Sequence, residues 1–346
     1  MPVSIGWCRL AARGHALGGH PESPGRIEAL VEIERGHMAG KLEQVPPLIP
    51  PAELLLQVHT DELLASLERA SRHGPVLLDS GDTFVLAESW VAAQQAAGAA
   101  VAITDYVLKH PGGYGFSAAR PPGHHATRSR AMGFCLLNNV AIAARFALGQ
   151  GVDRVLIVDF DVHHGNGTQD IFADDPAVFY LSLHQRLLFP GTGHLAETGT
   201  GPGLGTVLNV PLPAGTNDDG YLRLLDELLP RVAARFQPQL VLASAGYDAH
   251  WLDPLARLRL SAHGYYHITD RLRSIAHDYA NGRLAFILEG GYEPDALRRS
   301  VAATLAALLD QPPPSGENTS AEQPAPDVSQ LLDQVLDLHF GRESDR

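Results

Sequence analysis

The 346-residue sequence has only two cysteines, Cys8 and Cys135, and no long hydrophobic run. Two cysteines this far apart form neither a disulfide framework nor a CxxC zinc motif, so a reducing compartment is expected. No stretch reaches the roughly 18 consecutive apolar residues of a membrane-spanning helix, and residues 1–10 lack the basic and apolar regions of a signal peptide. These absences predict a cytoplasmic protein that does not associate with a membrane.

Positive charge is also scarce. The 26 lysines and arginines are outnumbered by 39 acidic residues, which gives a net charge of −13. An acidic chain repels a phosphate backbone, so direct binding of nucleic acid is not expected. Glycine (34) and proline (25) are abundant but follow no collagen-like or low-complexity period, and 45% of the chain is hydrophobic. This composition indicates a globular protein and excludes a fibrous or wholly disordered one.

Short apolar runs alternate with stretches of helical periodicity. Residues 155–160, 178–183, 240–245 and 284–288 predict buried strands, and residues 88–109, 221–236 and 262–279 predict helices. This alternation predicts an α/β fold with a mostly parallel central sheet and helices on both faces. We expect one catalytic domain at residues 1–310, a flexible Pro/Ser-rich segment at 311–327, and a helix with a tail at 328–346.

Polar residues follow each of the four predicted strands. The strand at 155–160 precedes Asp161 and His163, the strand at 178–183 precedes His184, and the strand at 240–245 precedes Asp248. The last of the four runs into a Glu-Gly-Gly-Tyr sequence that ends at Tyr292. The carboxyl ends of parallel strands lie at one edge of a sheet, where α/β proteins bind their ligands. These groups are therefore expected to converge on one pocket.

Asp161, His163 and Asp248 offer two carboxylates and one imidazole, a set that suits a divalent cation with open positions for water and substrate. In an extended chain, alternate residues point to the same side, so Asp159 can share a face with Asp161 and His163. The Asp-x-His triplet by itself also fits a capped turn at the end of a strand. Spacing alone leaves both interpretations open.

The sequence also contains 17 histidines, of which His124 and His125 are adjacent in a loop stiffened by proline and glycine. Neighbouring imidazoles can take a proton from water and deliver one to a leaving amine, although a histidine-rich surface loop has the same appearance. Tyr292 follows two glycines that allow close approach of the backbone. Its phenol could stabilise an oxyanion, or it could be an ordinary amphipathic rim residue.

These candidate residues all lie within six short sequence blocks. They are RPPGHHA (120–126), GFCLLNN (133–139), VDFDVHHGNGTQ (158–169), SLHQRLLFPGTG (182–193), AGYDA (245–249) with DPL (253–255), and EGGY (289–292). In this order they resemble the signature blocks of the histone deacetylase family. The sequence is most similar to the bacterial histone deacetylase-like amidohydrolases, which group with eukaryotic class II enzymes and with acetylpolyamine amidohydrolases. The resemblance implies the arginase/deacetylase α/β fold.

The resemblance also implies roles for the residues of these blocks. Asp161, His163 and Asp248 would bind Zn²⁺, with Fe²⁺ as an alternative in the cell. His124 and His125 would be the tandem imidazole pair, and Tyr292 the phenol that polarises the scissile carbonyl. Asp159 would orient His124, and Asn166 would face His125. The class I pattern has an aspartate at position 166, so Asn166 should support the charged form of His125 less strongly.

The resemblance further implies a narrow substrate tunnel and a second ion. Phe134 and Phe189 would form the tunnel walls and Gly133 its lining, with Leu255, Gly290 and Gly291 also near the substrate. Asp82 lies in a loop that could reach the entrance. A structural K⁺ would lie near Asp159, Asp161 and His163, with the hydroxyl of Ser182 and the carbonyl of Leu183.

The activity implied by these residues is hydrolysis of an acyl group from an amine. Acyl-lysine in peptides or proteins is the favoured substrate, because Leu255 occupies the position where an acidic gatekeeper would select polyamines. Asp82 and the net charge of −13 favour the alternative, an acetylated polyamine. An arginase-like two-metal site is disfavoured, because Gly165 and His250 occupy the positions of its additional carboxylates.

A non-catalytic acyl-lysine binding protein remains an alternative from another class, although the retained imidazoles and Tyr292 argue against it. A homo-oligomer is also possible by resemblance, because related bacterial enzymes include dimers and tetramers.

Residues 20–26 fit either a turn that enters a helix at 26–34 or the family segment whose arginine borders an internal cavity. His59 is expected near a helix cap, and His184 and His250 are expected to be satisfied core residues or groups supporting the site.

Overall fold

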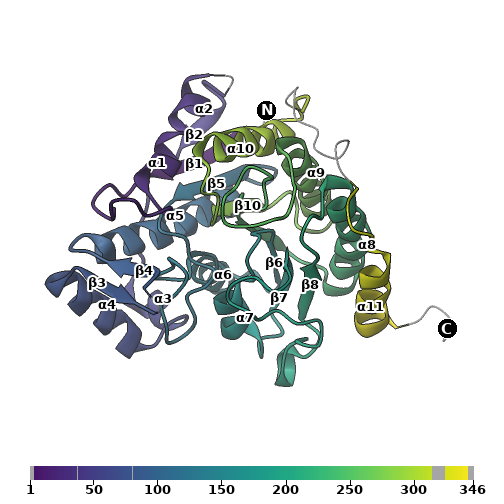
Figure 1. Ribbon diagram of the computed structural model, residues 1–346, viewed down its shortest axis with the longest axis horizontal. Coiled ribbons are helices and arrows are strands. Elements are labelled where there is room, and N and C mark those ends of the chain that lie inside the picture. Colours follow the sequence, from purple (N-terminus) through teal and green to yellow (C-terminus); the bar gives the residue numbers. More distant parts are fainter. Residues whose placement is uncertain (1–3, 37, 80, 314–323, 342–346) are drawn as a thin grey trace.

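Eight parallel strands form the central sheet of the computed structural model, which describes residues 4–36, 38–79, 81–313 and 324–341 (Figure 1). Their order is β2-β1-β5-β10-β9-β6-β7-β8. The strands are β1 (Ile5–Leu10), β2 (Leu42–Gln44), β5 (Tyr114–Ala119), β6 (Val155–Asp159), β7 (Val178–Gln185), β8 (Val207–Leu212), β9 (Leu240–Ala245) and β10 (Leu284–Leu288). A separate antiparallel hairpin consists of β3 (Val76–Leu78) and β4 (Thr83–Val85). The predicted parallel sheet and its four predicted strands are confirmed.

Helices cover both faces of this sheet, as the alternation of elements predicted (Figure 1). They are α1 (Pro24–Glu28), α2 (Val31–Arg35), α3 (Ala52–Leu56), α4 (Asp61–His73), α5 (Ser89–Lys109), α6 (Asn139–Gly149), α7 (Asn166–Phe172), α8 (Asp218–Phe236), α9 (Ala262–Tyr279), α10 (Pro294–Leu308) and α11 (Ser329–Phe340). A short 3₁₀ turn lies at Gly201–Gly203. The three helices predicted from periodicity correspond to α5, α8 and α9.

Alternate residues of each strand enter two different hydrophobic cores. In β10, Phe286 packs in a core with α8, α9 and α10, whereas Ile287 packs in the core formed by α5 and α6. This follows from the two-residue period of a strand, which sends successive side chains to opposite faces. The near-continuous hydrophobic strands are thus explained by burial on both faces.

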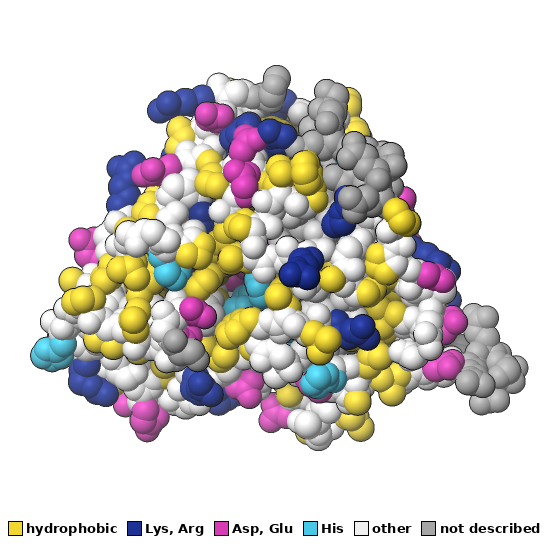
Figure 2. All heavy atoms as spheres, viewed as in Figure 1, with side chains coloured by type: hydrophobic (Ala, Val, Ile, Leu, Met, Phe, Trp, Pro, Cys, Tyr) yellow, Lys and Arg dark blue, Asp and Glu magenta, His cyan; other side chains and the backbone are white. Residues whose placement is uncertain are grey.

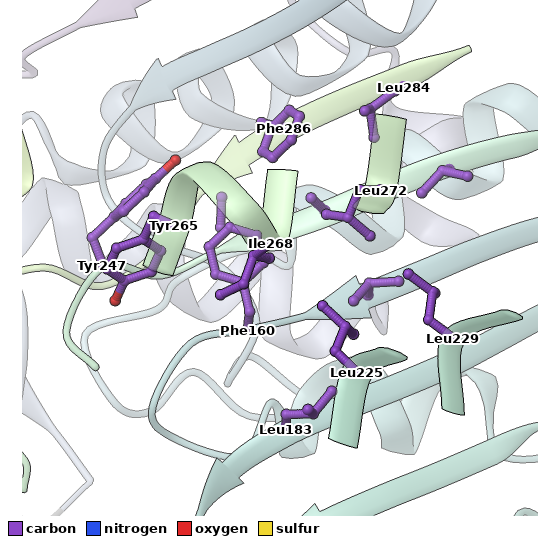
Figure 3. Packing of buried hydrophobic residues seen from close by; sticks show 14 of the residues in the cluster. Phe160, Leu183, Leu225, Leu229, Tyr247, Tyr265, Ile268, Leu272, Leu284 and Phe286 are labelled. Carbon is purple, nitrogen blue, oxygen red and sulfur yellow. The ribbon is translucent and has the colours of Figure 1, made fainter. Parts of the chain in front are cut away.

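The core beneath α8 and α9 reaches directly to the strand ends that carry polar residues. Phe160, which follows β6, belongs to the same core as Leu225 of α8 and Ile268 of α9, all of which are drawn in Figure 3. Phe160 also contacts the ring of Tyr247, with centroids 5.8 Å apart. Phe160 is only 1% exposed, and it lies between Asp159 and Asp161 in the sequence. Its burial in the core therefore fixes the backbone that carries these two aspartates.

Polar caps begin several of the helices. The side chains of Asn217, Ser261 and Asn138 accept hydrogen bonds from backbone N–H groups in the first turns of α8, α9 and α6. Glu293 caps α10, and Pro294 follows it at a position where a missing N–H costs nothing. These caps satisfy N–H groups that lack partners within the helix.

The helix predicted at residues 26–34 is instead divided into α1 and α2. The amide of Leu30 bonds to the carbonyl of Ile27, three residues earlier, so a tighter turn interrupts the α-helical pattern. Ile27, Leu30 and Ile33 are all buried in the core, and Arg26 points into the interior. Because the three apolar residues are spaced three apart, the three-residue period of the tighter turn keeps them on one face.

The C-terminal helix predicted at 328–340 is present as α11 and packs against β8. Val335 is fully buried there, and Arg235 of α8 donates to the carbonyl of His339. Most of the Pro/Ser-rich segment predicted at 311–327 and the tail at 342–346 lie outside the described residues. In the part of the chain that the structure describes, no helix is long and apolar enough to cross a bilayer.

Truncation of Leu225 to alanine tests how much the core under α8 contributes to the stability of the fold. Leu225 is 1% exposed, so Leu225→Ala should lower the free energy of unfolding by about 2–5 kcal/mol. Leu338→Ala in α11 is the control, because that side chain is 50% exposed and should cost less than about 0.5 kcal/mol. Denaturant titration of both variants checks this, and equal unfolding midpoints would contradict it.

Candidate active site

Loops that follow neighbouring strands bring the predicted polar residues together. β6, β9 and β10 are consecutive in the sheet, with β7 and β5 beside them. The loop after β6 supplies Asp161 and His163, the loop after β9 supplies Asp248, and the loop after β5 supplies His124 and His125. The carboxyl edge of the sheet therefore carries a single cluster of titratable groups.

Asp161, His163 and Asp248 form a candidate metal site. One ligand atom from each of the three lies within 4.8 Å of the others. The Nδ1 atom of His163 is 3.1 Å from Oδ1 of Asp161 and 3.0 Å from Oδ2 of Asp248. Both carboxylates are 1% exposed, and two buried negative charges require compensation by positive charge. A divalent cation with oxygen and nitrogen ligands fits this donor set.

Backbone amides hold both carboxylates in place. The Asp161 carboxylate accepts hydrogen bonds from the N–H of His163 (2.8 Å) and of Gly290 (2.8 Å), and Asp248 accepts from Val162 (3.0 Å). A Cβ atom on Gly290 would lie 2.1 Å from Oδ2 of Asp248. The glycine is therefore required by the carboxylates that pack against it.

The two adjacent histidines have different partners. Nδ1 of His124 lies 3.0 Å from the Asp159 carboxylate, and Nδ1 of His125 lies 2.9 Å from the amide oxygen of Asn166. The two rings are stacked at an angle with centroids 4.0 Å apart. In each ring, Nδ1 is engaged, so Nε2 is the nitrogen left for proton transfer.

These surroundings push the pKa values of the two imidazoles apart. Burial opposes the charged form of His124, but the carboxylates of Asp161 and Asp159 outweigh burial and raise its pKa to about 10. Burial and the positive charge of His124 lower the pKa of His125 well below its usual value. One imidazole is thus held as a cation and its neighbour as a neutral base, an arrangement typical of paired acid–base groups.

A pocket of about 360 Å³ leads to these groups. Its lining includes His125, His163 and Tyr292 together with Gly133, Phe134 and Phe189. Asp82 and Leu255 also line it, so the structure places both at the pocket. Figure 2 shows hydrophobic side chains around a central hollow in which histidine is visible.

Glycine at position 133 keeps this pocket open. A Cβ atom there would lie 2.5 Å from the ring of His125 and 2.8 Å from that of Phe189. Gly133 also has a φ of +57°, a conformation that favours glycine. Phe134 stands edge-on to Tyr292, with ring centroids 5.6 Å apart, and Phe189 stands edge-on to His125, with centroids 5.0 Å apart. Each of these two phenylalanines therefore contacts a group of the candidate site.

Gly290 and Gly291 lie beneath the pocket and are not among its lining residues. Both are buried, and their backbone contacts the carboxylates and the side chain of Arg26. The structure therefore places these two residues, which the resemblance associated with substrate, where they support the metal-binding groups and Tyr292.

Arg26 is the buried arginine of the segment at residues 20–26. Its guanidinium donates to the carbonyls of Gly291 and Glu289 and lies 4.7 Å from the ring centroid of Tyr292. Glu22 pairs with Arg26 and also with Arg120, and all three side chains are buried. The segment thus does more than enter a helix, because it contacts the loop that carries Tyr292.

Three supporting residues received no role from the sequence. Glu289 accepts hydrogen bonds from the N–H groups of Gly123 and His124, and burial raises its pKa to about 7. His20 lines the pocket, and Asp253 accepts from the N–H of Tyr292. Glu289 begins the EGGY block and Asp253 begins the DPL block, so their membership of these blocks was the sequence feature that could have indicated a role.

His59, His184 and His250 are all buried. His59 accepts from the N–H of Asn138 and contacts the carbonyl of Thr127, while the neighbouring Thr60 is the residue that caps α4. His184 bonds to Ser182 and to the carbonyl of Gly193. They are satisfied histidines close to the site, as expected for His184 and His250.

The residues associated with potassium lie at the end of β6, in the loop that follows it, and in the second half of β7. Asp159 and Ser182 are direct partners across these two strands. The hydroxyl of Ser182 lies 2.9 Å from Nδ1 of His184, and the carbonyl of Leu183 accepts a hydrogen bond from Tyr221. The loop of Asp161 and His163 is joined to the end of β7 by the bond from the Gln185 N–H to the Val162 carbonyl.

Comparisons with known proteins agree with this architecture. Residues 20–308 match the model of the histone deacetylase domain. The chain is 38% identical to histone deacetylase 10, chloroplastic, of Oryza sativa subsp. japonica, over 96% of this chain and 80% of that protein. It is 37% identical to the histone deacetylase-like amidohydrolase of Pseudomonas aeruginosa, over 84% of this chain and 76% of that protein. A probable deacetylase of Archaeoglobus fulgidus is 40% identical, with 84% and 81% covered.

The solved crystal structure of the HDA15 HD domain superposes with a TM-score of 0.88 at 32% identity, covering 98% of this chain and 95% of that one. The single-domain α/β architecture is therefore the arginase/deacetylase fold. The chain belongs to the histone deacetylase family, whose members are deacetylases and related amidohydrolases.

Removal of the imidazole at position 163 tests the candidate metal site. A divalent cation that binds the folded state stabilises it by mass action, so added Zn²⁺ should raise the thermal midpoint of the metal-free protein. His163→Ala should abolish this rise and the metal retained after dialysis. His277→Ala is the control, because the His277 side chain is 83% exposed and distant from the cluster in sequence. An equal Zn²⁺-induced shift in both variants would refute the assignment.

Proposed function

We propose that this protein is a zinc-dependent amidohydrolase that removes acetyl or other acyl groups from the ε-amine of lysine in peptides or proteins. The observation that carries the proposal is the arrangement of one pocket. A neutral imidazole (His125) and a phenol (Tyr292) line its wall, and His163 of the candidate metal site lines it too. A narrow apolar lining suits the aliphatic stem of an acyl-lysine side chain.

Asp161, His163 and Asp248 are the residues that would hold the metal. Zn²⁺ is proposed because two carboxylates and one imidazole leave a catalytic ion with open coordination positions, and Fe²⁺ could take the same ligands. When bound, such an ion acts as a Lewis acid and increases the acidity of water. His163 is the most exposed of the three side chains, at 12%, and it also lines the pocket, so a metal held by these residues would be accessible from the pocket.

His125 is proposed to take the proton from the attacking water at Nε2. Its Nδ1 faces the Asn166 amide, which orients the ring without adding a negative charge that would favour the imidazolium. The same nitrogen can then pass the proton to the leaving amine. His124, oriented by Asp159, carries positive charge beside the reacting groups and keeps its neighbour neutral.

Tyr292 is proposed to donate a hydrogen bond from its hydroxyl to the developing oxyanion. Burial raises the pKa of the phenol well above its usual value, so the hydroxyl keeps its proton and acts as a donor. A donor aimed at the position where charge develops lowers the barrier without reorganising during the reaction.

A structural K⁺ is proposed between the end of β6 and the second half of β7, with oxygens from Asp159, Asp161, His163, Ser182 and Leu183. The pairing of Asp159 with Ser182 supports it, because this register puts a carboxylate and a hydroxyl side by side in a buried region. Oxygen ligands suit a hard cation.

The cytoplasmic location, the oligomeric state and the division of the chain at residues 310 and 327 stay predictions.

An acetylated polyamine is the second candidate substrate. Asp82 is an exposed carboxylate in the pocket lining, and it could attract a distal ammonium group. Leu255 in the same lining is apolar and favours acyl-lysine. A binding protein without activity is disfavoured, because it has no need of a neutral imidazole and a phenol in one pocket.

Tyr292→Phe tests the oxyanion role. Loss of one donor should lower kcat on an acetyl-lysine peptide by about 10²–10³, while the metal content stays unchanged. Tyr279→Phe makes the same chemical change at the end of α9 and should keep full activity. Turnover at the wild-type rate in Tyr292→Phe would remove this residue from the mechanism.

Leu255→Glu tests substrate selection at the entrance. The new carboxylate should attract the distal ammonium of N8-acetylspermidine by about 1 kcal/mol, which is roughly fivefold in kcat/KM relative to an acetyl-lysine peptide. Leu252→Glu adds the same charge three residues earlier, outside the pocket lining, and serves as the control. A wild-type preference for the polyamine, or no change in Leu255→Glu, would contradict the proposed selectivity.

A further inference from the structure

The peptide unit between Gly291 and Tyr292 is held at both ends by the side chains of Arg26 and Asp253. The carbonyl of Gly291 accepts a hydrogen bond of 2.6 Å from Nε of Arg26, and the N–H of Tyr292 donates one of 2.6 Å to Oδ2 of Asp253. Arg26 is 1% exposed and Asp253 is 7% exposed. Because the peptide unit is planar and is bonded on both sides, these two contacts fix its orientation.

The orientation of this peptide unit needs contacts from outside the loop, because the two glycines before Tyr292 allow many backbone conformations. Gly290 and Gly291 precede Tyr292, and Gly291 has a φ of +117°. Glycine adopts such values freely but also many others. The direction of the Tyr292 side chain therefore depends on how its peptide unit is held from outside the loop.

The carboxylate of Asp253 has a second partner. Its Oδ1 accepts a hydrogen bond of 3.0 Å from the N–H of Leu255, a residue of the pocket lining, and its own N–H donates to the carbonyl of His250. One carboxylate thus connects the loop after β9, which carries Leu255, to the loop after β10, which carries Tyr292. Both of its acceptor atoms are used by backbone N–H groups.

We propose that Asp253 is a positioning residue that sets the orientation of the Tyr292 phenol and couples it to the pocket entrance at Leu255. The proposal rests on the role of Tyr292 as a hydrogen-bond donor in the proposed function. Asp253 is not itself among the residues that line the pocket, and among the described residues its carboxylate bonds only to the backbone N–H groups of Leu255 and Tyr292. Its effect on the reaction therefore passes through Tyr292.

Asp253→Asn is the sharpest variant, because it keeps the shape of the side chain. An asparagine has one acceptor oxygen, and its NH₂ group would face the other backbone N–H, so one of the two loops loses its bond. Misplacement of a reacting group by about 1 Å can cost up to 10²-fold in rate. We expect kcat to fall about tenfold, with KM changed less than about twofold and the metal content unchanged.

A double-mutant cycle with Tyr292→Phe separates positioning from general damage. If Asp253 acts through the phenol, Asp253→Asn should change kcat less than about twofold in the Tyr292→Phe background. Asp218→Asn is the matched control, since Asp218 is also a buried carboxylate with two donors, the N–H and hydroxyl of Ser261. That variant should destabilise the fold without lowering kcat.

Hydrogen exchange of the Tyr292 amide tests the contact without any catalytic readout. In protein labelled with ¹⁵N-tyrosine, nine tyrosine amides are observed, and Tyr292→Phe assigns the signal of interest. The wild-type amide should be protected, and Asp253→Asn should raise its exchange rate at least about tenfold. Because hydrogen exchange needs no substrate and no turnover, the measurement remains informative even if the proposed function fails.

Three results would overturn the inference. They are an unprotected Tyr292 amide in the wild-type protein, an unchanged kcat in Asp253→Asn, and an equal loss of kcat in both backgrounds of the cycle. Absence of turnover in the wild-type protein would instead refute the proposed function, and the exchange experiment would still decide the contact between Asp253 and Tyr292.

Discussion

The burial of two carboxylates beside one imidazole is the constraint on which the rest of the site depends. Asp161 and Asp248 are almost inaccessible to water, and a buried charge costs several kcal/mol unless it is compensated. Backbone N–H groups from two loops supply part of the compensation, and a cation suits the remainder. The same bonds join the loop after β6 to the loops after β9 and β10, so the charge requirement also determines how these three loops meet.

The pocket is assembled mainly by polar contacts between residues that are far apart in sequence. Glu289 binds the backbone beside His124, and Arg26 binds the carbonyl of Gly291. The glycines at positions 133 and 290 contribute by leaving room for side chains that arrive from other loops. Regular secondary structure brings the loops to one edge of the sheet, and these contacts then determine the local geometry.

The fold was predictable from the sequence where the signal is local. Strands β6, β7, β9 and β10 are continuous apolar runs, and helices α5, α8 and α9 have clear periodicity, so their bounds agree with the prediction to within a few residues. The strand-end pattern likewise indicated that Asp161, His163 and Asp248 would meet. The division of the N-terminal helix was not predicted, because the three-residue spacing of Ile27, Leu30 and Ile33 fits a continuous α-helix as well as two helical segments joined by a tighter turn.

The contributions of Arg26 and Asp253 could not be predicted for a related reason. Arg26 contacts a carbonyl 265 residues later in the chain, and Asp253 contacts an amide 39 residues later. Neither contact leaves a periodic or compositional trace in the sequence around it. Only the three-dimensional arrangement of the loops shows that both act on one peptide unit.

The position of α11 has a consequence for how copies of this protein meet in solution. β8 is the last strand of the sheet, and its outer side has no strand partner in the described part of the chain. An open strand edge is a template for pairing with another molecule. By packing against β8, α11 limits access to this edge, so the C-terminal helix protects against strand-to-strand aggregation at a place remote from the chemistry (Figure 1).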